Sequence, residues 1–346
     1  VQFLIGPAAY CRKPAASARA NPYHRDRADF LVYTQSMRAR EGILDSPNGE
    51  DVVRRYVGDA VEILAPRMQT APLVLSSPHS GSDYSEDFLG ASRLNAFDLR
   101  RSEDSFVNEL FSLAPHHGVP LMHALFPRAY VDPNREAYEL DPNMFQGNLP
   151  AYVKTRSDRV RAGFGTIARV VANGAEIYRE KLHFADAAAR IERYYEPYHA
   201  TLRGLIDETR ERFSFAILID CHSMPSVGGP SDRDAGLRRT DIVLGDRFGT
   251  ACAAEVTDHA EQTLLDLGFR VARNEPYAGA HTTSHYGRPA EGVHTLQVEI
   301  NRALYMEEAQ FARSHGHGEL TERLGEFVRG MAAIEPAPLK RRHNGA

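Results

Sequence analysis

The stretch AILIDCHSMPS, residues 216–226, decides the fold class of this chain. Its apolar residues lead directly into Asp220, and His222 follows two positions later. A short apolar run that breaks at turn-forming residues is typical of a buried strand entering a loop. Because a catalytic or metal-binding group needs a rigid support, an acid and a histidine at the end of such a strand indicate a functional site.

Similar apolar runs occur at residues 71–77, 119–126 and 296–300, and each predicts a further strand. Segments with helical periodicity alternate with them. Residues 99–113 follow a capping Asp98, residues 185–213 predict a long helix with a kink at Pro197, and residues 246–267 predict another. This alternation predicts the α/β class, as a three-layer sandwich in which helices flank a mixed, mostly parallel sheet.

The composition excludes several classes of function. The 346 residues are 42% hydrophobic and 25% charged, with a formal net charge of -5, and this balance is typical of a soluble globular protein without a nucleic-acid partner. No apolar run approaches the ~18 residues that span a bilayer, so we expect no membrane partner. Three distant cysteines fit neither a disulfide framework nor a cysteine metal site, and they favour a reducing, cytoplasmic location.

The domain organisation follows from where periodicity starts and stops. Residues 1–68 have mixed charge and scattered prolines, and we expect a partly disordered N-terminal extension with a helix near residues 51–63. Residues 69–335 are expected to form one catalytic domain. Residues 336–346 include the basic run LKRRHNGA and predict a solvated tail. The sequence does not fix the oligomeric state and allows a homo-oligomer.

Polar residues directly follow three of the predicted strands, at 78–81, 132–136 and 220–223. Ligands of open parallel sheets bind at the carboxyl ends of the strands, so we expect these loops to converge. His79 and His222 become candidate ligands of one metal, although either alone is also typical of a hydrogen-bonded structural histidine.

A third metal ligand should be a carboxylate or another histidine. Asp83 and Glu86 follow His79 closely, whereas Asp104 lies in the first turn of the next predicted helix. Spacing alone does not choose among these three acids.

Glu299 interrupts the apolar run of residues 296–300. A buried carboxylate is costly without a partner, and burial raises its pKa into the range that suits a general base or acid. The alternative is a salt bridge to Arg302 on an exposed strand face.

Two more segments supply candidates for substrate binding. Arg128 and the pair Asn134 and Arg135 offer guanidinium and amide donors that suit a carboxylate, and Asp132 is placed to hold an arginine. Residues 274–289, NEPYAGAHTTSHYGRP, have the composition of a loop that folds over a ligand, with an ordered surface turn as the alternative.

Taken together, these motifs resemble the N-formylglutamate amidohydrolase family, which belongs with the zinc carboxypeptidase and aspartoacylase-like hydrolases. The matching segments occur in order between about residues 72 and 308: SPHSG, SEDSFV, RAYVDPNRE, LIDCHSMPS, DIVLGDRFGTAC, GAHTTSHYGRP and LQVEINRALYMEE. The resemblance implies a zinc-carboxypeptidase-like fold (phosphorylase/hydrolase-like) with one divalent metal, zinc, at the carboxyl edge of the sheet.

The resemblance also implies a role for each candidate residue. His79 and His222 match the family's histidine ligands. The superfamily's acidic ligand follows the first histidine by three positions, where this chain has Ser82, so Asp104 is implied as the substitute with Asp83 in reserve. The other implied roles are catalytic for Glu299 and Arg128, substrate-carboxylate binding for Asn134 and Arg135, and substrate selection for His281, His285, Tyr286 and Arg288.

The implied reaction is hydrolysis of N-formyl-L-glutamate to formate and L-glutamate, a step of histidine degradation. Alternatives are a hydrolase of another N-acyl amino acid or small peptide, and a metal-binding paralogue without turnover. Asp220 shares a side of the predicted strand with His222, and we expect it to orient a ligand imidazole such as that of His79.

Overall fold

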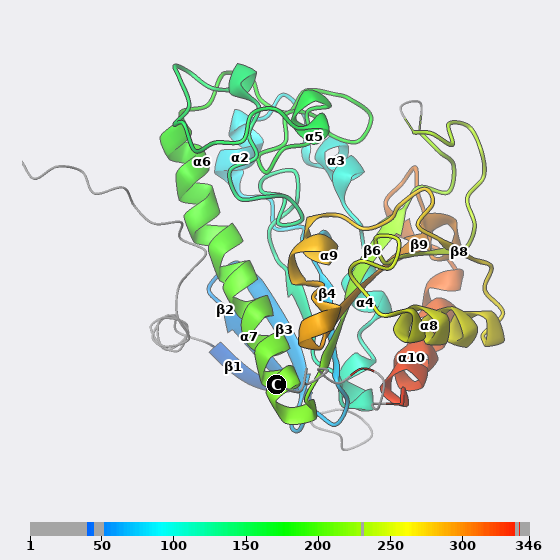
Figure 1. Cartoon of the computed structure of the whole chain (residues 1–346). Coiled ribbons are helices and arrows are strands. Elements are labelled where there is room, and N and C mark those ends of the chain that lie inside the picture. The colour runs from blue at the N-terminus through cyan, green and yellow to red at the C-terminus, as the bar shows by residue number, and fades with distance from the viewer. Residues whose placement is uncertain (1–39, 45–51, 230–231, 336–338, 340–346) are drawn as a thin grey trace, which may run out of the picture.

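A computed structural model describes residues 40–44, 52–229, 232–335 and 339 (Figure 1). The strands are β1 Arg40–Leu44, β2 Val52–Val57, β3 Val61–Pro66, β4 Leu73–Ser77, β5 Leu121–Ala124, β6 Ala216–Met224, β7 Ile242–Gly245, β8 Val271–Arg273, β9 Val293–Asn301, β10 Met306–Glu307 and β11 Ala312–Arg313. The α-helices are α2 Glu86–Ala91, α3 Ala96–Leu99, α4 Val107–Leu110, α5 Asp158–Arg161, α6 Phe184–Arg190, α7 Glu196–Phe213, α8 Ala254–Asp266, α9 His281–Tyr286 and α10 Gly316–Ala332.

Nine of these strands form one mixed sheet in the order β1-β2-β3-β5-β4-β6-β9-β7-β8. The central strands β5, β4, β6 and β9 run parallel, whereas β3 and β7 pair antiparallel with the two sides of this centre. The longest pairing joins β6 to β9 over nine residues. The predicted mixed α/β sheet is confirmed, and its parallel part is the centre.

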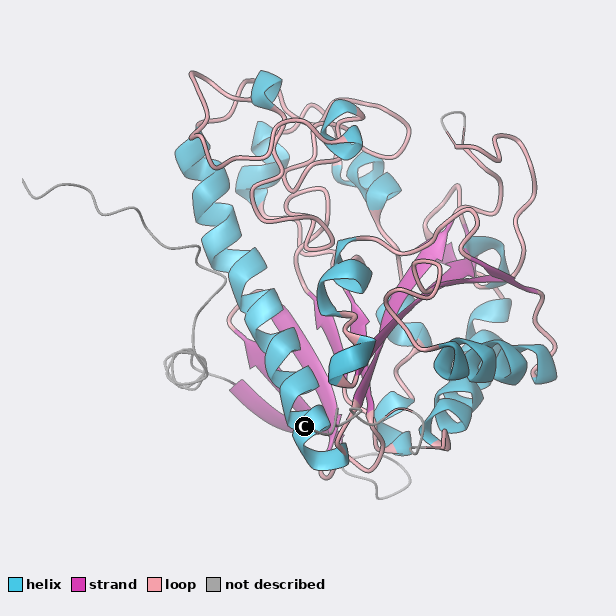
Figure 2. Cartoon of the chain, in the orientation of Figure 1, coloured by secondary structure: helices cyan, strands magenta, loops and turns pink. Residues whose placement is uncertain are grey.

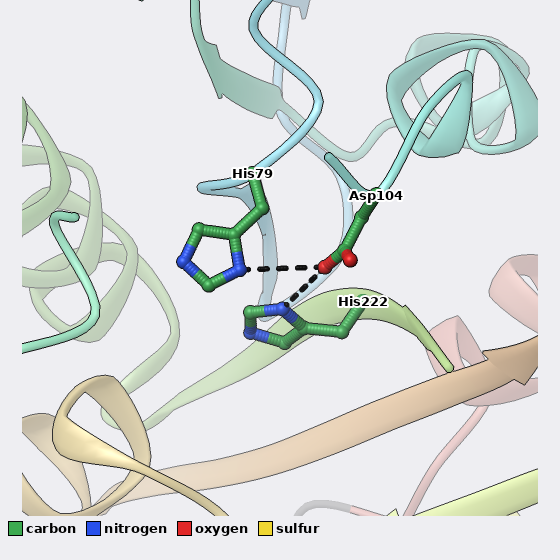
Figure 3. Close-up of side chains that lie close together, drawn as sticks. All are labelled: His79, Asp104 and His222. Atoms are coloured by element: carbon green, nitrogen blue, oxygen red, sulfur yellow. Dashed lines mark hydrogen bonds and ion pairs between the residues drawn. The ribbon is translucent and has the colours of Figure 1, made fainter. Parts of the chain in front are cut away.

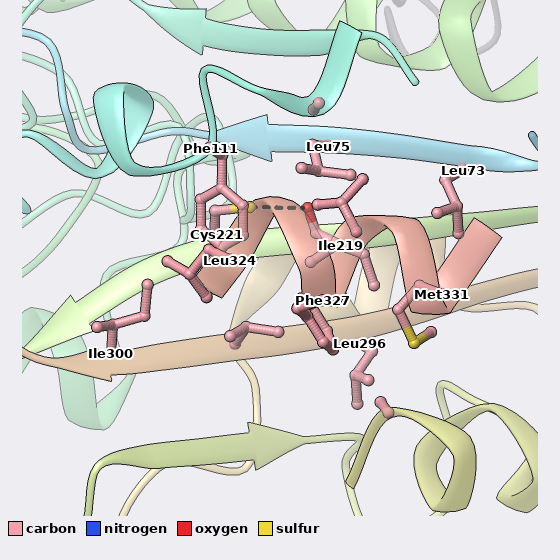
Figure 4. Packing of buried hydrophobic residues seen from close by; sticks show 14 of the residues in the cluster. Leu73, Leu75, Phe111, Ile219, Cys221, Leu296, Ile300, Leu324, Phe327 and Met331 are labelled. Carbon is pink, nitrogen blue, oxygen red and sulfur yellow. Dashed lines mark hydrogen bonds between the residues drawn. The ribbon is translucent and has the colours of Figure 1, made fainter. Parts of the chain in front are cut away.

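The two faces of the sheet are covered by different helices, which gives three layers (Figure 1). Along β6, Ile217, Ile219 and Cys221 enter the core that contains α8 and α10, as Figure 4 shows for the α10 side. The alternate residues Ala216 and Leu218 enter the core under α6 and α7. Because side chains alternate along a strand, Asp220 and His222 continue the second series.

Loops and short helices gather at one end of the sheet (Figure 2). Two of the three polar segments predicted to converge, residues 78–81 and 132–136, follow β4 and β5 at this end, whereas residues 220–223 form the last part of β6 itself. Within the described residues, no helix is both long and apolar enough to cross a bilayer.

The expected helix near residues 51–63 is wrong, because β2 and β3 form an antiparallel hairpin at these positions. β3 also pairs with β5, so residues 52–66 belong to the main sheet and not to an extension. The sequence carried the signal: valine-rich runs flank Gly58, which takes the left-handed backbone conformation in the turn. Residues 1–39 and most of the predicted basic tail lie outside the described residues.

Two predicted helices are shorter than their periodicity indicated. The helix expected over residues 99–113 is broken into α3, a 3-10 turn Arg100–Ser102 and α4, and Asn95 rather than Asp98 caps it. The helix expected from Asp246 begins only at Ala254. In each case polar side chains bind backbone amides near the expected start, which favours turns over a continuous helix.

The long helix near residues 185–213 is confirmed with one addition. A π-helical segment, Ile191–Tyr195, separates α6 from α7 directly before Pro197. Such segments widen a helix locally and are frequent at functional sites.

Phe327 on α10 provides a test of this packing, because its ring is fully buried against the sheet. We expect Phe327→Ala to lower the free energy of unfolding by about 3–5 kcal/mol, from lost burial and the cavity left behind. Leu237→Ala, at a side chain that is 64% exposed, should change it by less than about 0.5 kcal/mol. Urea unfolding of both variants measures the difference, and equal losses would contradict the assigned core.

Candidate metal centre

Three side chains from distant parts of the chain meet at the carboxyl ends of β4 and β6: His79, Asp104 and His222 (Figure 3). One carboxylate oxygen, Oδ2 of Asp104, lies 3.3 Å from Nδ1 of His79 and 3.0 Å from Nδ1 of His222. All three residues are buried, and their potential ligand atoms lie within 4.8 Å of one another. Within the described residues, this is the one group of histidine, cysteine or acidic side chains suited to a metal ion.

The broken helix after residue 99 explains how Asp104 reaches this point. The chain leaves the 3-10 turn at Glu103, and the amide of Asp104 donates to the carbonyl oxygen of His79 at 3.0 Å. Phe106 then takes a left-handed conformation and starts α4. A continuous helix would lack this loop. The break in the predicted helix is therefore what brings Asp104 next to His79.

Neither reserve candidate joins the group. Asp83 and Glu86 are exposed, and Glu86 begins α2. The geometry therefore favours Asp104 as the acidic ligand.

Asp132 orients the imidazole of His79. Its Oδ1 lies 2.8 Å from Nε2 of His79 and also accepts from the backbone amide of Asn134, while Oδ2 accepts from Arg128. Burial alone would raise the pKa of Asp132, but the charges of Arg128 and Arg135 outweigh burial and hold that pKa well below its ordinary value. Asp132 thus holds an arginine, as expected. It also contacts the imidazole of His79, which was the contact expected of Asp220.

Asp220 lies instead beside His222, with Oδ1 3.1 Å from Nε2. Its carboxylate is fully buried, and apart from this imidazole neither oxygen has a hydrogen-bond donor among the described residues. A buried acceptor without a donor is costly. If Nδ1 of His222 binds a cation, its ring proton must occupy Nε2, which then faces the carboxylate of Asp220. The donor set and its surroundings therefore fit a divalent metal.

The charge balance leads to the same conclusion. Burial favours the neutral form of Asp104, but hydrogen bonds with His222 and His79 hold its pKa well below the ordinary value. Burial likewise lowers the pKa of His222, but the charges and hydrogen bonds of Asp220 and Asp104 outweigh burial and hold it well above the ordinary value. The acidic groups around His222 therefore favour positive charge at this point of the cluster, which suits a bound cation.

Glu299 lies on the neighbouring strand, directly across from His222 in the β6–β9 register. It is 8% exposed, and its Oε1 accepts a hydrogen bond from Gln297 at 3.0 Å. Burial raises the pKa of Glu299 to about 7. A carboxylate with this pKa suits proton transfer near neutral pH. The expected alternative, an exposed salt bridge to Arg302, does not form, because Arg302 binds Asp104.

Of the predicted substrate-binding residues, Asn134 contacts the candidate metal ligands. Asn134 lies with Nδ2 3.1 Å from Nε2 of His222, and its Oδ1 accepts from the amide of Thr282 at the start of α9. Arg135 is buried and donates to the carbonyls of Phe164 and Asn134. The loop after β5 and helix α9 are thus joined through one amide side chain.

The predicted selecting loop contains helix α9. The rings of His281 and His285 stack with centroids 5.1 Å apart, and Tyr286 is buried under them. Arg288 is exposed, and its guanidinium donates to the carbonyls of Ser284 and Gly287 at the end of α9. Those contacts do not bring Arg288 to the metal ligands.

Several known proteins that are similar to this chain belong to one family. The model of one family, N-formylglutamate amidohydrolase, matches residues 71–306. The chain belongs to this family. A solved N-formylglutamate amidohydrolase from Ralstonia eutropha JMP134 is 36% identical, with a TM-score of 0.73, and the match covers 79% of this chain and 97% of that one.

Two curated relatives are similar over most of their length. The N-formylglutamate deformylase of Pseudomonas putida is 29% identical over 247 residues, which cover 69% of this chain and 83% of the relative. That of Pseudomonas aeruginosa is 27% identical over 257 residues, covering 72% and 88%.

Sequence reasoning missed three residues that shape the site in this family member. Tyr195, in the π-helical segment, donates to the carbonyl of Arg135. His199, one turn later on α7, lies with Nε2 2.8 Å from the carbonyl of Pro133 and Nδ1 2.8 Å from the hydroxyl of Tyr286. Arg302 contacts Asp104. Tyr195 and His199 are four residues apart in the predicted long helix, and this spacing could have indicated that they share a face. The spacing does not indicate what that face contacts.

The identity of the acidic ligand can be tested with a matched pair of substitutions. We expect Asp104→Asn to weaken metal binding by more than the roughly 10–100-fold that residues outside the ligand set contribute. Asp83→Asn should retain the metal content of the unmodified protein, because Asp83 is exposed and outside the group. Elemental analysis after dialysis measures both, with circular dichroism to confirm folding. Metal loss in Asp83→Asn alone would assign the ligand to Asp83.

Proposed function

We propose that this protein hydrolyses N-formyl-L-glutamate to formate and L-glutamate with one bound zinc ion. The observation that carries the proposal is the buried group of His79, Asp104 and His222 with Glu299 in register beside it. The names of the relatives supply the substrate. Two imidazoles and one carboxylate are a ligand set that leaves a position open on zinc.

The zinc ion, when bound, would supply Lewis-acid chemistry by polarising the amide carbonyl and lowering the pKa of water. Glu299 removes the proton from the attacking water as general base. The same carboxyl group then carries that proton to the leaving nitrogen, so that the amine departs neutral. A carboxylate with a pKa near 7 is suited to both transfers.

Arg128 has the role of stabilising the oxyanion that develops on the carbonyl oxygen. Its guanidinium is held by Asp132 at 2.8 Å, and its side chain remains 21% exposed, so part of it is free to reach a ligand. The loss of one such donor typically costs about 3–4 kcal/mol of transition-state stabilisation. Asp132 therefore connects a metal ligand to an oxyanion donor through a single buried carboxylate.

We assign the carboxylates of the substrate to the surrounding donors. We assign to Asn134 and Arg135 the α-carboxylate, which would fix the amide against the attacking water, and Arg135 would have to exchange part of its carbonyl contacts for the substrate. The loop with His281, His285, Tyr286 and Arg288 is assigned to substrate selection, and Arg288 would have to leave its carbonyl partners to contribute. The partner is thus a small N-acyl amino acid, and the two free cysteines of the described residues, both buried, are compatible with the cytoplasm.

The activity is tested by formate release. Purified protein loaded with zinc, cobalt or manganese should release formate and L-glutamate from N-formyl-L-glutamate. Measured as release of the free amino acid, this reaction should be faster than hydrolysis of N-acetyl-L-glutamate, N-formyl-L-aspartate or N-formyl-L-methionine. A higher kcat/KM for another member of this panel would assign a different N-acyl amino acid. Full metal loading with no turnover in the panel would instead support a non-catalytic metal-binding protein.

The role of Glu299 predicts a specific kinetic effect. Glu299→Gln keeps the shape of the side chain but cannot accept the proton, so kcat should fall about 100- to 10,000-fold. The metal content should stay at one equivalent, because Glu299 is not in the ligand group. Glu291→Gln, at an exposed residue just before β9, is the control and should behave as wild type. If Glu299→Gln retained kcat within threefold, another group would have to be the base.

A further inference from the structure

Arg302 is a buried cation in direct contact with the proposed metal ligand Asp104. Its side chain is 11% exposed and that of Asp104 is 3% exposed. The Nη2 group donates to Oδ1 of Asp104 at 3.0 Å and to the carbonyl of Glu103 at 2.7 Å. The Nε group donates to the hydroxyl of Ser223 at 3.2 Å. Arg302 thus joins the end of β9 to the Asp104 turn and the end of β6.

The two oxygens of Asp104 consequently have different environments. Oδ1 faces the guanidinium, whereas Oδ2 faces Nδ1 of both histidines. A free carboxylate can offer a metal either one oxygen or both. We propose that Arg302 is a positioning residue that holds Asp104 as a one-oxygen ligand and thereby sets the metal affinity of the site.

The short side chain of Asp104 explains why such support is needed. Asp104 enters the site from a separate turn, 25 positions after His79, and not from the loop that carries His79. Its position therefore depends on how that turn is fastened to the sheet. Arg302 fastens both the backbone, through the carbonyl of Glu103, and the carboxylate itself.

A substitution at a neighbouring residue distinguishes positioning of the Asp104 carboxylate from general support of the turn that carries it. Tyr305 is fully buried, and its hydroxyl donates to the carbonyl of Ser105 at 3.0 Å. Tyr305→Phe removes this hydrogen bond and the hydroxyl's contact with Ser223, but it leaves the contact between Arg302 and the carboxylate in place. It is the matched control for Arg302→Met, which removes the guanidinium but keeps much of the apolar length.

The experiment measures metal affinity directly and rests on the proposed metal site, not on the substrate. Metal-free protein is titrated with zinc against a chromophoric chelator, and cobalt-loaded protein is examined by visible absorption. We expect Arg302→Met to bind zinc ~10–100-fold more weakly and to show an altered cobalt spectrum, because a freed carboxylate changes the coordination. Arg302→Lys should recover part of the affinity, since one ammonium replaces some of the donors, and Tyr305→Phe should stay within threefold of wild type.

Each outcome separates this inference from the proposed reaction. Wild-type affinity and an unchanged cobalt spectrum in Arg302→Met would overturn the inference alone, as would an equal loss in Tyr305→Phe. If Arg302→Met does not fold, Arg302→Lys carries the test through the same two measurements. If the wild-type protein does not bind zinc, both the metal site and this role of Arg302 are overturned. If the zinc affinities are as expected but no formate is released, the proposed reaction is overturned and the role of Arg302 stands.

Discussion

The centre of this protein is constrained by the cost of burying charge. Five ionisable side chains are buried here: those of Asp104, Asp132, Asp220, His222 and Arg302. Each needs a partner of opposite charge or a hydrogen bond. Asp104 meets this requirement with two imidazoles and a guanidinium. Among the described residues, Asp220 meets it only through Nε2 of His222, 3.1 Å away. That contact requires a proton on Nε2, so Nδ1 of His222 is the ring nitrogen that remains to bind a cation.

The sheet supplies the rigidity that such a cluster needs. His222 lies inside β6 rather than in a loop, and the nine-residue pairing with β9 fixes Glu299 beside it. Metal chemistry and proton transfer are therefore assigned to adjacent strands, whose spacing of about 4.8 Å is set by backbone hydrogen bonds. The loops add the groups that have to meet a substrate. The loop after β5 is anchored by Tyr195 of the π-helical segment and by His199 of α7.

The residues around Asp132 and Asp104 show how one carboxylate can serve two functions. Asp132 binds the imidazole of His79 with one oxygen and Arg128 with the other. Asp104 divides its oxygens in the same way between the imidazoles and Arg302. In both cases an arginine restrains the carboxylate from the side away from the ligand histidine, which is an efficient way to fix a short side chain in a low-dielectric interior.

The sequence by itself determined the α/β class, the strands that carry His222 and Glu299, and the family, because apolar runs and local motifs are properties of neighbouring residues. It also indicated His79 and His222 as ligands. It could not choose among Asp83, Glu86 and Asp104, it gave Asp220 the contact with His79 that Asp132 makes, and it took the β2–β3 hairpin for a helix. The tertiary structure brings Asp104 to the two histidines, and it decides the other two points. Each depends on which distant segments pack together. The grouping of candidate ligands, the pairing of buried charges and the position of Arg302 follow from long-range burial, which the spacing of residues along the chain does not encode.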